Sequence, residues 1–159
     1  CYLSKALNAN SNEIEGMVIG GHGDTTMIPL ASKATYKGIP VTDLLSKEEL
    51  AKVVADTMVG GATLTKLLGT SAWYAPGAAA AYVVESIIRD QKKVIVSCTY
   101  LEGEYGQQDI CIGVPAVIGK NGVEKILSLK LTDEEKALFE KSAAAVHKTN
   151  AVLKEINAL

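Results

Sequence analysis

The sequence has 159 residues, enough for one domain with a core of its own and too few for two ordinary domains. Apolar residues make up 48% and charged residues 21% of it, a balance typical of soluble globular proteins. The 16 basic and 18 acidic residues leave a net charge of −2 with no block of like charge, which argues against nucleic acid or a membrane surface as partner. The longest stretch without a charge or a turn signal, residues 78–84, is far shorter than the roughly 20 residues of a membrane-spanning helix.

Three cysteines cannot all pair with one another, and none of them lies in a Cys-x-x-Cys motif. This odd count predicts a reducing, cytoplasmic setting. Cys98 and Cys111 have β-branched neighbours and are predicted to be small core residues. Cys1 opens the chain inside what reads as a helix, so we expect the sequence to be a fragment of a longer protein.

The first strand signal is the apolar run at residues 17–19. It leads into residues 20–24, where three glycines within four positions force a sharp, irregular turn around His22. Residues 27–30 continue as a second extended segment, and residues 38–41 predict a turn. A histidine is thereby placed on a loop between two short strands.

Two helices are predicted next. Residues 46–49 form a capping box, and the apolar residues after it recur at close to the helical period until Gly69 ends the run. Thr70 and Ser71 are expected to cap a second helix that continues to about Asp90.

The following region predicts a long antiparallel hairpin. Every even position of residues 110–118 is apolar, and an Asn-Gly turn leads into a returning strand over residues 123–131. Pro115 within the first arm predicts an edge position or a bulge, because proline lacks the N–H that a central strand must donate.

A second capping box, residues 132–135, begins a helix that is predicted to continue to the C-terminus. The residues expected on its inward face are Leu138, Ser142, Ala145, Val152, Ile156 and Leu159. Hairpins and helices without any βαβ unit predict an α+β fold in which antiparallel hairpins pack with long helices.

The residues alone leave two interpretations of His22 open, a catalytic acid or base and a structural loop histidine. Asp24 lies too close along the chain to orient that ring easily and is expected to bind loop amides instead. His147 is predicted to be a surface residue of the last helix. Without carboxylates or thiols at ligand spacing, no metal site is expected. No phosphate-binding glycine motif is present, so no nucleotide site is predicted from these residues.

Several short motifs, in this order, resemble those of the lactate/malate dehydrogenase family. They lie at residues 18–24 around His22 and at residues 27–30, 38–41, 69–76, 102–106, 113–115 and 119–124. The likeness covers essentially the whole chain and is closest to the lactate-dehydrogenase-like malate dehydrogenases of bacteria. Lactate dehydrogenases usually carry Gly-Tyr-Thr before the tryptophan and Ala-Ile-Gly after it, where this chain has Ser71-Ala72 and Tyr74-Ala75-Pro76.

The resemblance implies that residues 1–159 are the C-terminal substrate domain of an NAD-dependent malate dehydrogenase. It implies that His22 takes the hydroxyl proton of malate as hydride leaves C2 for the nicotinamide, and returns it when oxaloacetate is reduced. Ser71 corresponds to a wall of the substrate pocket. NAD is then bound mainly by an N-terminal Rossmann domain that this chain lacks, together with the aspartate that orients the histidine and the arginines that clamp the substrate. We therefore expect the isolated chain to be inactive.

Three alternatives stay open. The intact enzyme could be a lactate or other 2-hydroxyacid dehydrogenase, because the deciding side chain lies on the missing active-site loop. The chain could instead be an oligomerisation module without activity, since alanine-rich helices suit self-association and the family uses this half in subunit contacts. A metal-dependent hydrolase built on His22 and Asp24 is the least favoured.

Overall fold

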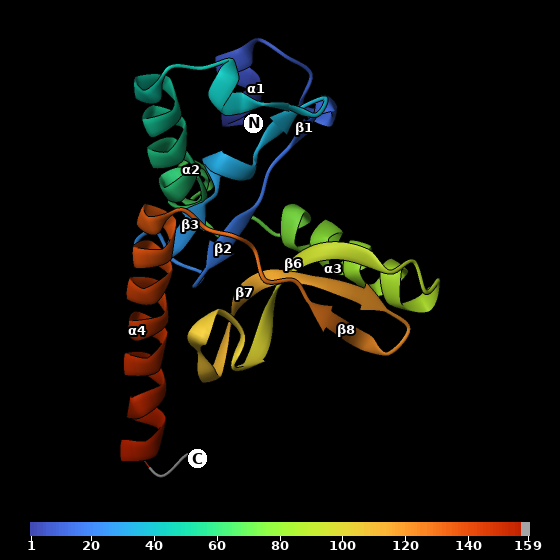
Figure 1. Cartoon of the computed structure of the whole chain (residues 1–159), viewed down its shortest axis with the longest axis vertical. Coiled ribbons are helices and arrows are strands. Elements are labelled where there is room, and N and C mark those ends of the chain that lie inside the picture. Colours follow the sequence, from blue (N-terminus) through green and yellow to red (C-terminus); the bar gives the residue numbers. More distant parts are fainter. Residues whose placement is uncertain (157–159) are drawn as a thin grey trace.

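A computed structural model describes residues 1–156 and confirms the predicted α+β fold (Figure 1). Its helices are α1 (Tyr2–Leu7), α2 (Lys47–Leu68), α3 (Tyr74–Ile88) and α4 (Asp133–Glu155). Its strands are β1 (Ile14–Glu15), β2 (Val18–Gly20), β3 (Met27–Pro29), β4 (Thr35–Tyr36), β5 (Ile39–Pro40), β6 (Lys93–Glu102), β7 (Gln108–Gly119) and β8 (Gly122–Ile126).

The strands form two sheets, and every pairing among the described residues is antiparallel. The smaller sheet has the order β1-β4-β5, and the larger has the order β3-β2-β7-β6 with β8 also paired to β7. The short hairpin β2–β3 joins the rest of its sheet at one residue pair, Gly20 opposite Gly113. A Cβ atom added at Gly113 would lie 2.7 Å from the Gly20 carbonyl oxygen, so this junction requires glycine.

Pro115 lies in β7, an internal strand, so the predicted edge position is wrong; a bulge is present in the pairing of β7 with β8, but it lies between Val117 and Ile118. The Pro115 carbonyl oxygen accepts a hydrogen bond from the Leu127 amide, 2.9 Å away. In an antiparallel strand the N–H and C=O of one residue face the same neighbour. The missing N–H therefore faces β8 just where β8 ends at Ile126, so no donor is lost from the pairing.

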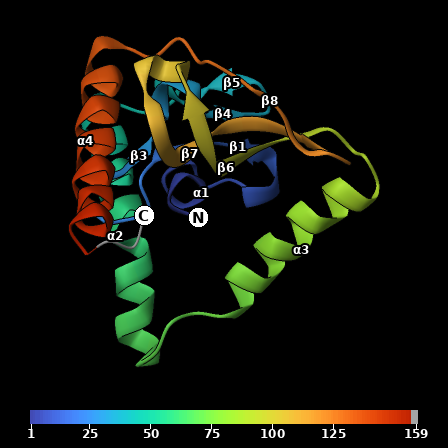
Figure 2. The ribbon, with the colours of Figure 1, turned by 90° about the horizontal axis from the view of Figure 1, so that it is seen from below.

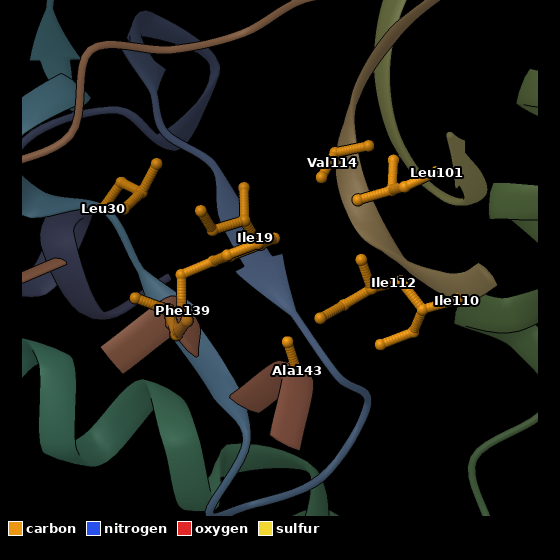
Figure 3. Packing of buried hydrophobic residues seen from close by; sticks show 9 residues of the cluster. Ile19, Leu30, Leu101, Ile110, Ile112, Val114, Phe139 and Ala143 are labelled. Atoms are coloured by element: carbon orange, nitrogen blue, oxygen red, sulfur yellow. The ribbon is translucent and has the colours of Figure 1, made fainter. Parts of the chain in front are cut away.

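The even positions of residues 110–118 in β7 are buried, as their alternation predicts, and they form the centre of the core. Ile110, Ile112 and Val114 lie together with Ile19 of β2 and Phe139 of α4 (Figure 3). The predicted return strand is shorter than expected. The strand that pairs with β7 is Gly122–Ile126, and Leu129 and Leu131 after it pack against the core outside any strand.

Helix α4 begins at the predicted capping box, with hydrogen bonds between Thr132 and Glu135 in both directions. Its inward face differs from the prediction. The side chains that meet the core are Phe139, Ser142, Ala143 and Val146. Of the predicted set, only Ser142 is buried: Leu138, Ala145, Val152 and Ile156 are exposed, and Leu159 lies outside the described residues. Val146 is the last α4 side chain that packs against the core, so among the described residues the apolar side chains of the second half have no core partner.

Helices α2 and α3 form a corner that projects from the sheets (Figure 2). The capping box at Ser46 and the left-handed C-cap at Gly69 confirm the predicted bounds of α2. The predicted cap of α3 is wrong, because the N-cap is Trp73 without a side-chain hydrogen bond, and Ser71 lies in the connection. Within residues 1–156, no helix combines the length and apolar character needed to cross a bilayer.

The prediction that Cys98 and Cys111 are core residues is also wrong, since both are exposed. Residues opposite each other in a sheet share a face. Cys98 lies opposite Gly113, and Cys111 lies opposite Tyr100, so both thiols are on the face of β6–β7 that points away from the buried even positions.

Candidate functional site

His22 lies in the loop that joins β2 to β3. The strands pair from Val18 to Gly20, and Gly20 has φ +93°, a conformation that favours glycine and that directs the chain out of the sheet. The Gly23 carbonyl accepts hydrogen bonds from the amides of Thr26 and Met27, both 2.9 Å away. The loop is therefore a closed turn, and its histidine is exposed at the tip.

The loop glycines are required by close packing as well as by backbone conformation. A Cβ added at Gly20 would lie 2.5 Å from the Thr26 carbonyl oxygen and 2.9 Å from the Ser142 Oγ. One added at Gly21 would lie 2.9 Å from the Thr26 Oγ1. These contacts leave no room for side chains beside His22, which fits a ring that must remain open to a small molecule.

His22 borders an open hollow of about 620 Å³ that is lined by residues of β2, β6, β7 and α4. The polar side chains that line it are His22, Ser97, Cys98 and Cys111, and the rest of the lining is apolar or glycine. Among residues 1–156, no hydrogen bond or ion pair engages the His22 ring, and no Lys, Arg, Asp or Glu lines this hollow. This hollow thus offers one acid–base group, and the described residues that line it carry no charge that could bind an anionic substrate.

One thiol of the hollow, Cys98, is a poor candidate for a nucleophile. Partial desolvation raises the pKa of the Cys98 thiol above its usual value, and the neighbouring Cys111 raises it further. A nucleophilic cysteine needs the opposite shift, because the thiolate is the reactive form. Among the side chains that line this hollow, the His22 imidazole is the residue type that most often serves as a general acid or base.

The other predicted site residues do not join His22. Asp24 borders a different hollow beside Lys141, and the loop amides that it was expected to bind are held by the Gly23 carbonyl instead. Ser71 lines a hollow at the α2–α3 corner, between Leu68 and Trp73. His147 is exposed on α4, where the sequence analysis placed it.

Neither a metal nor a dinucleotide is held by the described residues alone. Within residues 1–156, no three His, Cys, Asp or Glu side chains are grouped to bind a metal ion. The glycine-rich loop continues into strand β3 and not into a helix, so no helix N-terminus faces it to receive a pyrophosphate. The residues present therefore do not fit a nicotinamide dinucleotide without a second domain.

Sequence reasoning missed one residue beneath the loop. Ser142 was expected only to face inward from α4, whereas its hydroxyl bonds both ends of the His22 loop. A serine beside three alanines on the inward face of a helix was the available signal for a buried hydroxyl. The neighbouring residues do not indicate with which segment that hydroxyl forms hydrogen bonds.

A histidine on a glycine-crowded hairpin loop, in an antiparallel α+β domain, is the arrangement of a dehydrogenase C-terminal domain. Residues 1–156 match the family described as lactate/malate dehydrogenase, alpha/beta C-terminal domain. The chain belongs to this family, and this match confirms the resemblance found in the sequence.

Known relatives agree with this assignment. The chain is 73% identical to a malate dehydrogenase of Parabacteroides distasonis over 158 residues, which is 99% of this chain and 50% of that protein. A solved malate dehydrogenase of Salinibacter ruber superposes with a TM-score of 0.93 at 38% identity, covering 99% of this chain and 51% of that one. A Cryptosporidium parvum lactate dehydrogenase, solved with lactic acid and β-nicotinamide adenine dinucleotide, gives 0.91 at 33% identity, covering 96% and 50%. The chain spans about half the length of the curated relatives it matches.

Proposed function

We propose that this chain is the C-terminal, substrate-binding half of a cytoplasmic NAD-dependent malate dehydrogenase, with His22 as the proton acceptor and donor. The observation that carries the proposal is an exposed histidine, free of side-chain partners in the described residues, on a closed glycine loop beside a hollow. The name of the relatives at 70% identity or above supports malate as substrate.

The chemistry assigned to this chain is the movement of one proton. Oxidation of the C2 hydroxyl of malate breaks the O–H and C2–H bonds and forms the carbonyl of oxaloacetate. The nicotinamide cofactor supplies the hydride chemistry when it is bound by the other half of the enzyme. His22 takes the hydroxyl proton, and in reduction it returns a proton to the carbonyl oxygen. General acid–base catalysis of this kind contributes about 10²–10⁴-fold to the rate.

The other half must also bind the substrate carboxylates. The only arginine of the sequence, Arg89, lies at the end of α3 and pairs with Glu85 at 3.0 Å, outside the hollow at His22. We therefore propose that the clamping cations and the choice between malate and lactate reside in the N-terminal half, while Ser71 contributes a wall of the substrate pocket.

We further propose that the chain forms homo-oligomers. The α2–α3 corner exposes large apolar side chains that water does not favour: Leu67 is 79%, Trp73 70% and Tyr74 93% exposed. Ile88 at the far end of α3 is 77% exposed. Sedimentation equilibrium tests this directly, and a strict monomer at high concentration contradicts it.

The test of His22 is a chimera that joins the N-terminal half of the Parabacteroides distasonis malate dehydrogenase to this chain. We expect oxaloacetate-dependent NADH oxidation by the chimera and none by the isolated 159-residue chain. His22→Asn should lower kcat by about 10²–10⁴-fold.

His147→Asn is the matched control, because His147 is the only other histidine and is exposed on α4. It should leave kcat unchanged. Equal activity of His22→Asn and the parent chimera contradicts the assigned role, and activity of the isolated chain contradicts the division of labour between the halves.

A further inference from the structure

We infer that Ser142 of α4 is a positioning residue for His22: its hydroxyl closes the loop that carries the histidine. The inference deepens the proposed function and rests on it as far as catalysis is concerned. It stands on two hydrogen bonds, on the burial of Ser142 and on the close packing of the loop glycines.

The Ser142 hydroxyl occupies a place in the β2–β3 ladder. Gly20 pairs with Met27, so the next residues along the hairpin are Gly21 and Thr26. The Ser142 Oγ accepts a hydrogen bond from the Gly21 N–H at 2.9 Å and donates one to the Thr26 carbonyl at 2.7 Å. The hydroxyl thus bridges the two backbone groups that open the loop, in the place of a direct bond between them.

The position of Ser142 is fixed by the core and not by the loop. It is 2% exposed and lies on the stripe of α4 that packs on the sheet, beside Phe139 and Ala143. One turn further, Val146 would be 3.3 Å from a Cβ at Gly21. The helix therefore sets where the Gly21 amide lies, and His22 is the next residue in the chain.

Without the hydroxyl, the loop loses the only side-chain hydrogen bonds that join it to α4 among the described residues. The Gly21 N–H and the Thr26 carbonyl would be left without a partner, and the backbone before His22 could move. Displacement of a catalytic group by about 1 Å costs on the order of 10²-fold in rate. Ser142 never needs to touch the substrate to have this effect.

The experiment uses two variants of Ser142. Ser142→Ala removes the hydroxyl, and Ser142→Thr keeps it. Ser86→Ala is the matched control, because Ser86 is also fully buried on a helix and donates one hydrogen bond at 2.7 Å, to the Ile118 carbonyl far from the loop. Each variant is made in the isolated chain for amide hydrogen exchange and in the chimera for kinetics.

In the isolated chain, Ser142→Ala should speed exchange of the Gly21 amide by about tenfold, while Ser86→Ala leaves it unchanged. In the chimera, Ser142→Ala should lower kcat by about 10- to 100-fold with little change in KM. Ser142→Thr should restore both. If Ser142→Ala does not fold, Ser142→Cys, with a weaker donor and acceptor, is measured in the same way.

The outcomes separate the two ideas. Unchanged exchange of the Gly21 amide, or an equal fall of kcat in Ser86→Ala and Ser142→Ala, overturns the positioning role. Full activity of the His22→Asn chimera instead overturns the proposed function, and the exchange measurement then still decides whether Ser142 holds the loop.

Discussion

The β2–β3 loop and the α2–α3 corner each carry a residue of the proposed site, and they are held in different ways. His22 sits on a turn whose amides and carbonyls are bonded within this chain, down to the hydroxyl of Ser142. Ser71 lies in a connection without a capping hydrogen bond, beside Trp73 and Tyr74, which are mostly exposed. The comparison teaches that hydrogen bonds within this chain hold the loop of the proposed acid–base residue, whereas no side-chain cap holds the segment of the proposed pocket wall.

The largest effect is expected from removing the aromatic ring that packs α4 into the core. Phe139 is 2% exposed and stacks at 5.0 Å, ring centre to ring centre, on Tyr105. Phe139→Ala should lower the free energy of unfolding by about 3–5 kcal/mol, measured by urea titration. Leu138→Ala, the neighbouring and half-exposed control, should change it by less than about 0.5 kcal/mol. A similar cost for both would mean that α4 faces the sheet differently.

A glycine exchange compares the two regions directly, because each contains one glycine with positive φ. Gly20→Ala should destabilise by about 2–4 kcal/mol, since the new Cβ meets backbone and the left-handed conformation is strained. Gly69, with φ +71°, has nothing within 4 Å of an added Cβ, so Gly69→Ala should cost only about 1–2 kcal/mol. Equal costs would show that the loop can relax as freely as the corner.

A smaller effect is expected at the corner itself. Ser71→Ala in the chimera should raise KM for oxaloacetate by about two- to tenfold and leave kcat within twofold, because a wall contact of this kind is worth about one hydrogen bond. Thr70→Ala, which lines the same hollow, is the control for truncating a hydroxyl there. A large fall in kcat with unchanged KM would place Ser71 nearer the chemistry than proposed.

The smallest effect is the pH dependence of the two capping boxes. Hydrogen bonds from the backbone and hydroxyl of Ser46 lower the pKa of Glu49, and at Glu135 partial burial raises the pKa but hydrogen bonds from Ser32 and Thr132 outweigh it. A carboxyl group whose pKa is lowered in the folded state stabilises the fold at pH values above its unfolded pKa of 4.5. This stabilisation is lost as the pH falls through the pKa of the folded state.

Urea unfolding between pH 6 and pH 3 should therefore show falling stability toward acid. Glu135→Gln should flatten this fall more than Glu134→Gln, which removes a charge from the same exposed turn of α4. Identical profiles for the two variants would argue against a role for the Glu135 hydrogen bonds in acid sensitivity.

Local patterns predicted most of the elements. Both capping boxes, the left-handed Gly69 and the buried even positions of β7 are present, because each depends on residues within a few positions of one another. The glycine loop at His22 was also predictable, since three glycines in four positions leave the backbone little choice.

Which face of a helix or strand is buried was harder to predict than where the helix or strand begins and ends. The stripe of α4 that meets the sheet and the side of β6 that carries Cys98 depend on what packs against them, and neighbouring apolar residues do not carry that information. The same holds for Ser142, whose partners lie 121 and 116 residues away. Tertiary partners, and not local propensity, decide those positions.

The bond from Gly21 to Ser142 also sets an order of events during synthesis. The hairpin β2–β3 is made of neighbouring residues and can form early, but Ser142, which bonds to Gly21, leaves the ribosome 121 residues later. At typical elongation rates this interval is roughly 6–24 seconds. A nascent chain therefore displays its histidine long before the histidine is fixed in place, and the loop of the proposed acid–base residue is completed only when nearly the whole domain has been made.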